Sequence, residues 1–386
     1  MTERNADDPG STTPTDGPAP IRLGTRASRL AVAQSQDVAD RLAKAAGRPV
    51  ELVTVTSEGD TNRASLASLG GTGVFASALR EALVAGEVDV LVHSLKDLPT
   101  APYDGLTIAS VPKRADARDV LVARNGATIE TLPEGAKVGT GSPRRVAQLK
   151  AKRPDLDVVD IRGNIDTRLG RVDDDLDAVV LAAAGLGRID RLSAATELLD
   201  LGFWPSAPGQ GALAVEIRAD ETDKGLLAAL RKLDHAPTRL TVTAEREVLA
   251  KLEAGCSAPI GASAVVDAEL LLVSATVYRP DGAEYRTASH AAHLDGSAQD
   301  RLDEALEVAG RVAAELLENG AAELADLVSS VSGSPAEGDH SAGPGLATPA
   351  AEQPADDAST NTGPTTTSPT TTSPTTTSPT TTTTTD

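Results

Sequence analysis

Three polar side chains follow directly on an apolar run in the segment HSLKDLP, residues 93–99. Ser94, Lys96 and Asp97 would lie at a strand end, where α/β folds carry their chemistry. On an open surface, an aspartate beside a lysine is an ion pair that contributes little stability. In a cleft that binds a positively charged species, Asp97 would stabilise that charge or move a proton, whereas we expect His93 to be a buried core residue.

Arginine residues recur at four turns where an expected strand leads into an expected helix. Backbone N–H groups at a helix start attract anions, and the guanidinium fork matches a carboxylate or a phosphate with two hydrogen bonds. A single arginine of this kind is more often solvated, but four such turns predict a site for several anionic groups of either chemistry. The residues are Arg26 in GTRAS, Arg144 and Arg145 in GTGSPRR, Arg162 and Arg168 in IRGNIDTRL, and Arg188 in AGLGR.

Cys256 is the only cysteine of the 386 residues and stands in the glycine-flanked segment KLEAGCSAPIG. A lone cysteine is usually a small buried apolar residue. A nucleophile or an attachment point would need an accessible loop and a positive neighbourhood. Both interpretations stay open from the residues alone, while an intrachain disulfide and a cysteine-based zinc site are excluded.

Strand-like and helix-like segments alternate between these turns, which predicts an α/β fold. Ser28 and Gly47 mark the two ends of the first helix, as N-cap and stop. From about residue 238 the pattern changes to a helix, a run of strands and a last helix, which predicts a smaller α+β unit. Expected strands lie at 21–24, 50–56, 88–94, 137–140 and 156–161 and near 262–291, and expected helices at 28–46, 74–86, 144–151, from 164, at 238–252 and at 297–318.

The net charge of −20 arises partly at the chain ends. Residues 331–386 carry six acidic side chains, no Lys or Arg, and SPTTT repeats without an apolar face. We expect both ends to be disordered, since neither can bury enough surface to offset its ordering entropy. The N-terminus lacks the apolar core of a signal peptide, and no apolar run reaches the length of a membrane span. We therefore expect a cytoplasmic protein that binds no nucleic acid.

Seven segments, in order, resemble the porphobilinogen deaminase (hydroxymethylbilane synthase) family of the tetrapyrrole pathway over roughly residues 20–325. They are IRLGTRASRLAVAQSQ, VDVLVHSLKDLPT, VGTGSPRR, IRGNIDTRL, LAAAGLGRI, PSAPGQGALAVE and TAEREVLAKLEAGCSAPIG. The resemblance implies an α/β fold of two doubly wound domains like those of periplasmic binding proteins, followed by a small α+β C-terminal domain. The implied boundaries are 20–114 with 210–234 for domain 1, 115–209 for domain 2 and 235–328 for domain 3, with disordered extensions at 1–19 and 329–386.

The resemblance also implies a dipyrromethane cofactor, bound covalently to Cys256 through a thioether. The family joins four porphobilinogen molecules head to tail with loss of ammonia from each, and no metal is implied. Every pyrrole brings two carboxylates, so the arginine turns would bind these groups, which are costly to bury unpaired. Asp97 would be catalytic by stabilising the azafulvenium cation that remains when ammonia leaves, with Lys96 holding a carboxylate beside it. The cofactor-binding positions of the family match Arg26, Ser28, Ser94, Lys96, Thr140, Ser142, Arg144, Arg145, Arg162, Gly163, Asn164, Arg168, Arg188 and Gln210.

Three positions depart from the family pattern. LASLGGTGVF has Ser68 and Thr72 where relatives often carry lysine, so this loop lacks those carboxylate-binding groups, although Phe75 is retained. Gly141 stands where many relatives have serine, which we expect to be a small change.

Two alternatives from other classes compete with this reading. A non-catalytic anion-binding module on the same two-lobed fold would suit the arginine turns, but it predicts no use for Cys256 and no third domain. A phosphate-transferring enzyme would need a glycine loop, and neither GGTGVF nor GLGR completes a Walker or dinucleotide fingerprint. The expected partner is therefore porphobilinogen, bound by a monomer away from membranes.

Overall fold

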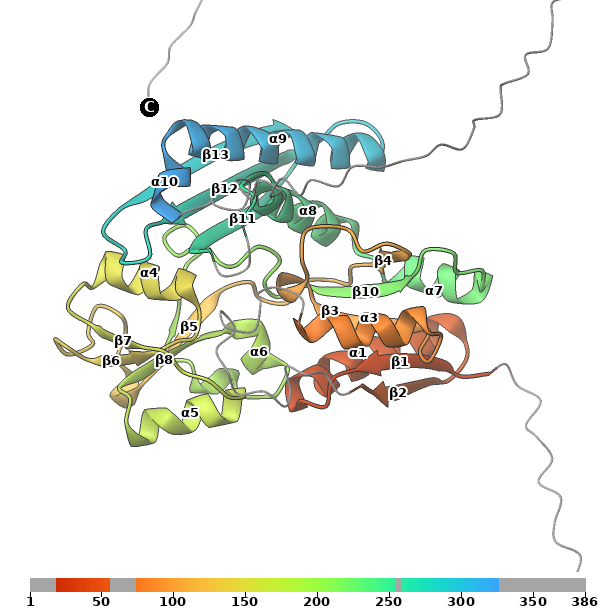
Figure 1. The fold of residues 1–386 in the computed structure, drawn as a ribbon, viewed down its shortest axis with the longest axis horizontal. Coiled ribbons are helices and arrows are strands. Elements are labelled where there is room, and N and C mark those ends of the chain that lie inside the picture. The colour runs from red at the N-terminus through yellow and green to blue at the C-terminus, as the bar shows by residue number, and fades with distance from the viewer. Residues whose placement is uncertain (1–18, 56–73, 255–257, 326–386) are drawn as a thin grey trace, which may run out of the picture. The chain divides into compact units, whose positions relative to one another are not determined.

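The first sheet has five strands in the order β2-β1-β3-β10-β4 (Figure 1). The computed structural model describes residues 19–55, 74–254 and 258–325. β1, β2 and β3 are parallel, and β10 lies antiparallel between β3 and β4. The strands are β1 (Ile21–Thr25), β2 (Val50–Thr54), β3 (Val90–Ser94), β4 (Leu106–Ser110) and β10 (Leu213–Arg218).

Helices cover both faces of this sheet because alternate residues of its strands point to opposite sides. Val90 and Val92 of β3 pack with residues of α1 and α7, whereas Leu91 between them packs with residues of α3. The predicted caps of the first helix are confirmed, since Ser28 accepts from the backbone N–H of Ala31 and Gly47 adopts a φ of 68°. The helices are α1 (Arg29–Ala46), α3 (Val74–Val84) and α7 (Lys224–Leu233).

The second sheet repeats this plan with the order β7-β6-β8-β5-β9. β6, β7 and β8 are parallel, and β5 lies antiparallel between β8 and β9. In each sheet the inserted antiparallel strand is also the strand by which the chain arrives from the other sheet. The elements are β5 (Asp119–Ala123), β6 (Lys137–Gly139), β7 (Asp157–Val159), β8 (Ala178–Ala182), β9 (Glu197–Leu198), α4 (Pro143–Lys152), α5 (Ile165–Asp174) and α6 (Ala183–Gly187).

The third sheet is an antiparallel meander, β11-β12-β13, with helices packed on one face (Figure 1). Its core combines alanine and branched apolar residues, among them Val248, Val273 and Val308, each buried. The predicted fold class, two doubly wound α/β sheets and a small α+β C-terminal unit, is confirmed. The elements are α8 (Ala236–Lys251), β11 (Ile260–Asp267), β12 (Leu270–Tyr278), β13 (Tyr285–His293), α9 (Ala298–Glu318) and α10 (Ala321–Ala325).

One buried carboxylate on α8 joins the two segments that pass between the first and second sheets. Glu245, fully buried, accepts from both terminal nitrogens of Arg114 at 2.7 and 2.9 Å and from the backbone N–H of Gly209 at 2.7 Å. It also accepts from Ala264 of β11 at 3.0 Å. Four donors satisfy the charge, so both crossings and the third sheet are held at one point.

Candidate anion-binding site

A short turn at the carboxyl end of β3 carries the predicted catalytic pair. This turn is a 3₁₀ helix, Leu95–Asp97, whose leucine is buried while Asp97 is exposed. Lys96 is half-buried, and its Nζ donates to Oε1 of Gln210 at 3.3 Å. Burial is the main cause that lowers the pKa of Lys96 to about 8. The positive charges of Arg145 and Arg144 also lower this pKa, whereas the negative charges of Asp97 and Asp119 raise it. The turn therefore presents an accessible carboxylate beside a lysine in a cationic environment.

Asp119, the first residue of β5, organises the other side of this site. Its fully buried carboxylate accepts from Arg144 at 2.8 Å and Arg145 at 2.6 Å. It also accepts from the indole N–H of Trp204 at 2.9 Å and from Nε2 of Gln210 at 2.8 Å. Although burial alone would raise the pKa of Asp119, the two guanidinium groups hold it far below its usual range.

The sequence interpretation did not identify Asp119. A local feature of the sequence could have identified it, because Asp119 is the one charged residue in the otherwise apolar segment DVLVA. All five residues of this segment are buried in the structure. A charged residue in such a strand needs partners. The two arginines of the SPRR turn supply them, so Asp119 is the counter-charge that allows these arginines to be buried.

Arg144 and Arg145 are 3% and 6% exposed, so both predicted binding residues lie in the interior. Arg144 also contacts Gln148 at 2.6 Å and the carbonyl of Pro205 at 3.1 Å. Arg145 also reaches the carbonyl of Val180 at 3.0 Å. Within the described residues, the buried Nε atoms of both arginines have no hydrogen-bond partner, so each retains donor capacity.

Two more predicted arginines extend the positive charge. Burial lowers the pKa of Arg168, and the neighbouring charges of Arg145 and Arg162 lower it further. Its Nε donates to the carbonyl of Gly163 at 2.9 Å, where that glycine has a φ of 104°. Arg162 Nε lies 3.5 Å from a carboxylate oxygen of Asp160, which is largely exposed.

Other predicted residues have structural contacts of their own. The Asn164 side chain caps α5 by accepting from the N–H of Thr167 at 2.8 Å. Arg188 donates to the carbonyl of Gly211 at 2.7 Å, and burial lowers its pKa to about 10. Ser94 donates to Gln34 at 3.3 Å. The Thr140 hydroxyl accepts from the N–H of Ser142 at 3.3 Å, the Arg26 side chain is half-buried at the end of β1, and Ser28 serves as the α1 cap.

The structure thus brings Lys96, Arg144, Arg145 and Gln210 together around Asp119, and Arg168 lies close enough to Arg145 and to Arg162 for their charges to lower its pKa. Gln210 is fully buried, where its Oε1 faces Lys96 and Arg145 and its Nε2 faces Asp119. The predictions for Cys256, Ser68 and Thr72 and for the side chain of Phe75 lie outside the described residues.

The structure leaves less room for a side chain at Gly141 than the sequence analysis expected. A Cβ atom at this position would lie 2.7 Å from the carbonyl oxygen of Ile161. Real Cβ atoms essentially never approach so closely, so a side chain requires the GTGSPRR turn to move away from Ile161. Glycine at position 141, where many relatives have serine, therefore allows the turns GTGSPRR and IRGNIDTRL, which both carry arginines, to approach each other closely.

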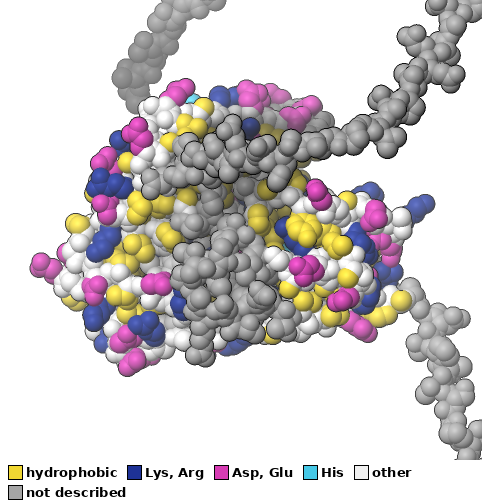
Figure 2. Space-filling model, viewed as in Figure 1, with side chains coloured by type: hydrophobic (Ala, Val, Ile, Leu, Met, Phe, Trp, Pro, Cys, Tyr) yellow, Lys and Arg dark blue, Asp and Glu magenta, His cyan; other side chains and the backbone are white. Residues whose placement is uncertain are grey.

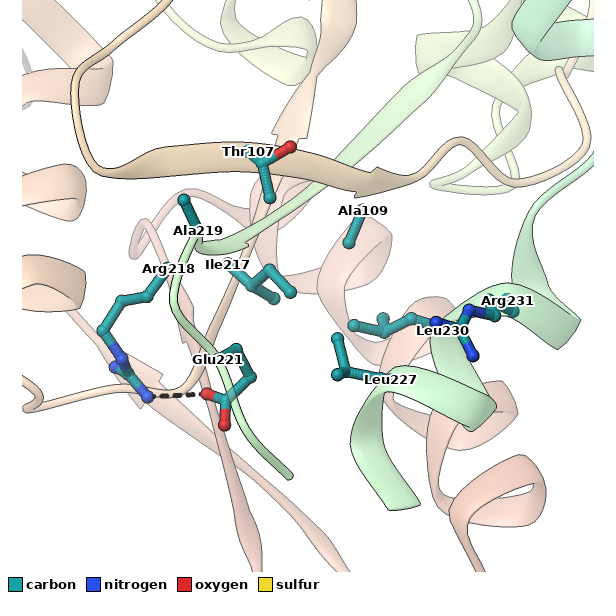
Figure 3. A pocket seen from close by; sticks show the side chains of 9 residues that line it. All are labelled: Thr107, Ala109, Ile217, Arg218, Ala219, Glu221, Leu227, Leu230 and Arg231. Carbon is teal, nitrogen blue, oxygen red and sulfur yellow. Dashed lines mark hydrogen bonds and ion pairs between the residues drawn. The ribbon is translucent and has the colours of Figure 1, made fainter. Parts of the chain in front are cut away.

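One hollow in the described part of the chain lies apart from these residues (Figure 3). It has a volume of about 270 Å³ between β4, β10 and α7, with Ile217 and Leu230 inside and the Arg218–Glu221 ion pair at one edge. None of the predicted site residues lines it.

Three further features of the described residues concern nucleic acids, metal ions and membranes. Figure 2 shows acidic and basic side chains interspersed on this face, with neither sign gathered into a large patch. Within residues 19–55, 74–254 and 258–325, no three His, Cys, Asp or Glu side chains gather as a metal site would require. The helices described there all fall short of the length and apolar character that a membrane crossing demands.

The charge balance of the site fits a ligand with several carboxylates. Arg144 and Arg145 pair with the buried carboxylate of Asp119, and Lys96 and Arg168 both lie within electrostatic range of Arg145. Burial is the main cause that lowers the pKa values of Lys96 and Arg168, and repulsion from neighbouring arginines lowers them further. The unpartnered Nε atoms of Arg144 and Arg145 add donors. The fold and the cationic site are those expected of an α/β protein that binds a polyanionic small molecule.

Comparison with known proteins identifies the family. Residues 21–225 match the sequence model described as porphobilinogen deaminase, dipyromethane cofactor binding domain, and residues 239–318 match the porphobilinogen deaminase C-terminal domain. The chain belongs to the porphobilinogen deaminase family.

Similar proteins include the porphobilinogen deaminase of Leifsonia xyli subsp. xyli, 62% identical over 81% of this chain and 98% of the relative. The porphobilinogen deaminase of Thermobifida fusca is 53% identical over 79% of this chain and 95% of its own length. Among solved structures, a periplasmic substrate-binding protein from Coxiella burnetii matches at a TM-score of 0.37 and 16% identity, over 58% of this chain and 96% of its own.

Proposed function

We propose that this chain is a hydroxymethylbilane synthase that joins four porphobilinogen molecules head to tail on a dipyrromethane primer and then releases hydroxymethylbilane by hydrolysis. Membership in the deaminase family, including the match to its cofactor-binding domain, carries this proposal. The same matches favour an enzyme of tetrapyrrole and heme biosynthesis over a non-catalytic anion-binding module.

The cationic cluster supports binding of the cofactor and the growing chain. Arg145, Arg162 and Arg168 would hold acetate and propionate groups, because guanidinium groups pair with carboxylates through charge-assisted hydrogen bonds. When bound through Cys256, the dipyrromethane supplies the free pyrrole α-carbon to which the first porphobilinogen is joined. Lys96 would bind a carboxylate in its charged form, and such a partner raises the lysine pKa toward its usual value.

Asp97 would act on the charge that develops in each condensation. The C–N bond of the substrate aminomethyl group breaks, a C–C bond forms to the α-carbon, and the proton lost from that carbon balances the one taken up by the departing ammonia. A carboxylate close to this centre stabilises positive charge on both partners and can move the proton. The exposed position of Asp97 on a turn anchored by a buried leucine supports this role.

We further propose the boundaries given from the sequence for the three domains, a monomeric state, a cytoplasmic location and no binding to nucleic acid. The three separate sheets support three domain cores. Size-exclusion chromatography with light scattering would test the monomer, which a dimer mass would exclude.

The intact masses of the wild-type protein and the Cys256→Ala variant test the cofactor directly. We expect the wild type to exceed its sequence mass by one dipyrromethane, after incubation with porphobilinogen if it is purified without cofactor, and the variant to show its sequence mass. An unmodified wild type after that incubation would contradict the attachment. Conversion of porphobilinogen to hydroxymethylbilane by wild type, with none by the variant, tests the reaction.

A further inference from the structure

The turn that carries Lys96 and Asp97 is bound from behind by an arginine of α8. The guanidinium of Arg246 donates from Nη1 to the carbonyls of Leu95 at 3.1 Å and Leu98 at 2.9 Å. Its Nη2 donates to the carbonyl of Pro99 at 2.7 Å. The first two carbonyls flank the catalytic pair on either side, so one side chain spans the whole turn.

The turn has few backbone hydrogen bonds, although the N–H of Leu95 also donates to the carbonyl of Ala212 at 3.1 Å. It is a single 3₁₀ turn, in which the N–H of Leu98 donates to the carbonyl of Leu95 at 3.2 Å. Short 3₁₀ segments have poorer hydrogen-bond geometry than α-helices and occur mostly at helix ends and in connections. The carbonyl of Leu95 is shared between this bond and Arg246, so the guanidinium holds the group that closes the turn.

Apolar packing directs the same face of α8 toward the turn. Val242 lies four residues before Arg246 and therefore on the same side of the helix. It is buried in one cluster with Leu95 and Leu98, the two leucines whose carbonyls the guanidinium binds. The leucines fix the depth of the turn, whereas Arg246 fixes the direction of its carbonyls.

We propose that Arg246 is a positioning residue for the condensation reaction, which sets the orientation of Asp97 by holding the Leu95–Pro99 backbone from α8. The proposal rests on the function proposed above. Because catalytic groups must be placed within a fraction of an ångström, a turn released by about 1 Å lowers turnover on the order of 10²-fold. Substrate binding depends mainly on the separate arginine cluster and should change much less.

An open hollow beside the guanidinium makes a chemical rescue possible. It has a volume of about 190 Å³, and its lining includes Leu95, Val242 and Arg246. Removing the arginine side chain enlarges this space to one that a free guanidinium ion can enter from solvent. Urea has nearly the same shape without the charge, so it is the matched negative control.

The experiment compares Arg246→Ala with Arg239→Ala on the same helix. Arg239 lines the same hollow, but its guanidinium pairs with Asp234 at 2.7 Å and reaches the carbonyls of Ala109 at 3.2 Å and Ile108 at 3.5 Å rather than those of the turn. We expect kcat of Arg246→Ala to fall between about 10- and 100-fold with KM changed less than about threefold. Millimolar guanidinium should restore part of kcat, urea should not, and Arg239→Ala should keep a kcat close to wild type.

A second readout does not depend on activity. Hydrogen exchange at the amide of Leu98 should become faster in Arg246→Ala and stay unchanged in Arg239→Ala, because exchange reports local opening of the turn. If Arg246→Ala does not fold, Arg246→Lys replaces it, and a fall in kcat with faster exchange at Leu98 supports the proposal. An inactive wild type would count against the proposed function, and the exchange measurement would still decide the role of Arg246. Wild-type kcat and unchanged exchange in the variant, or an equal loss in Arg239→Ala, would overturn it.

Discussion

Gln210 donates from its side-chain amide to the buried carboxylate of Asp119 at 2.8 Å, which places a residue that precedes β10 of the first sheet against the first residue of β5 in the second. The opposite end of the same amide accepts from Lys96 at 3.3 Å and lies 3.5 Å from Arg145. One neutral side chain therefore bridges the lysine beside the proposed catalytic aspartate and the counter-charge of the arginine turn. The two halves of the site are built as one hydrogen-bonded unit.

Replacing Asp119 should damage stability more than any exposed acidic residue would. In Asp119→Asn, Arg144 and Arg145 lose their buried counter-charge, which costs about 3–5 kcal/mol when one partner of a buried pair is removed. Urea denaturation measures the loss. The control is Asp160→Asn, whose carboxylate is largely exposed beside Arg162, and it should stay within about 0.5 kcal/mol of wild type. Equal stability of both variants would show that Asp119 is not the required counter-charge.

The depressed pKa of Lys96 predicts a pH-dependent gain in stability for Lys96→Met. The folded protein holds this lysine at a pKa of about 8, against 10.5 for the ordinary group. Below pH 8 both states are protonated, so wild type bears the full cost of the buried charge. Between pH 8 and 10.5 only the folded state loses the proton, and wild-type stability rises relative to the variant.

Urea denaturation of wild type and Lys96→Met at pH 7 and pH 10 tests this expectation. The variant should unfold at higher urea concentration at pH 7, and the difference should shrink at pH 10. If the difference in stability between the two proteins stayed constant with pH, burial of the charged Lys96 would not destabilise the free protein. The variant should also lose activity, because it cannot bind a carboxylate.

Asp97→Asn should abolish most turnover while leaving the fold intact. The side chain is exposed, so its replacement should change the free energy of unfolding by less than about 0.5 kcal/mol. Loss of its charge should reduce kcat by on the order of 10²-fold or more, as expected for an electrostatic catalytic group. Asp104→Asn, another exposed aspartate nearby in sequence, is the control and should keep wild-type kcat. A mild effect of Asp97→Asn would remove it from the central role.

A chain that ends at residue 331 should keep the catalytic constants of the full protein. The deaminase family matches end at residue 318, and every candidate site residue precedes that point. Steady-state kinetics of the two chains would show the same kcat and KM within error. A large fall in kcat would assign the C-terminal segment a part in the reaction.

Local signals account for most of what the sequence predicted. Ser28, Gly47 and Asn164 marked helix ends that the structure confirms, because capping depends on neighbouring residues alone. The arginine turns were also visible locally, and four of their six arginines interact in one cluster. Arg188 instead binds the Gly211 carbonyl, and Arg26 lies at the end of β1.

Pairings between distant segments were not predictable in this way. The partners of Asp119 lie 25, 26, 85 and 91 residues away along the chain, and no periodicity links them. The antiparallel insertion of β5 and β10 could not be predicted for the same reason. The pairing of strands that lie far apart in the chain is not encoded in the residues of either strand alone. Gln210 was matched only as a cofactor-binding position, and the partners that place it in the interior, at both ends of its amide, come from distant segments.

The insertion of β10 between β3 and β4 has a consequence for how the chain is made. When a ribosome has completed residue 205, all five strands of the second sheet exist, but β4 has no neighbour in the first sheet until β10 emerges. The segment synthesised first is thus the later of the two α/β sheets to close. Until then the unpaired edge of β3 can pair with a wrong strand. The fraction of chains that fold correctly during synthesis should therefore depend on how quickly the ribosome reaches residue 218, the end of β10.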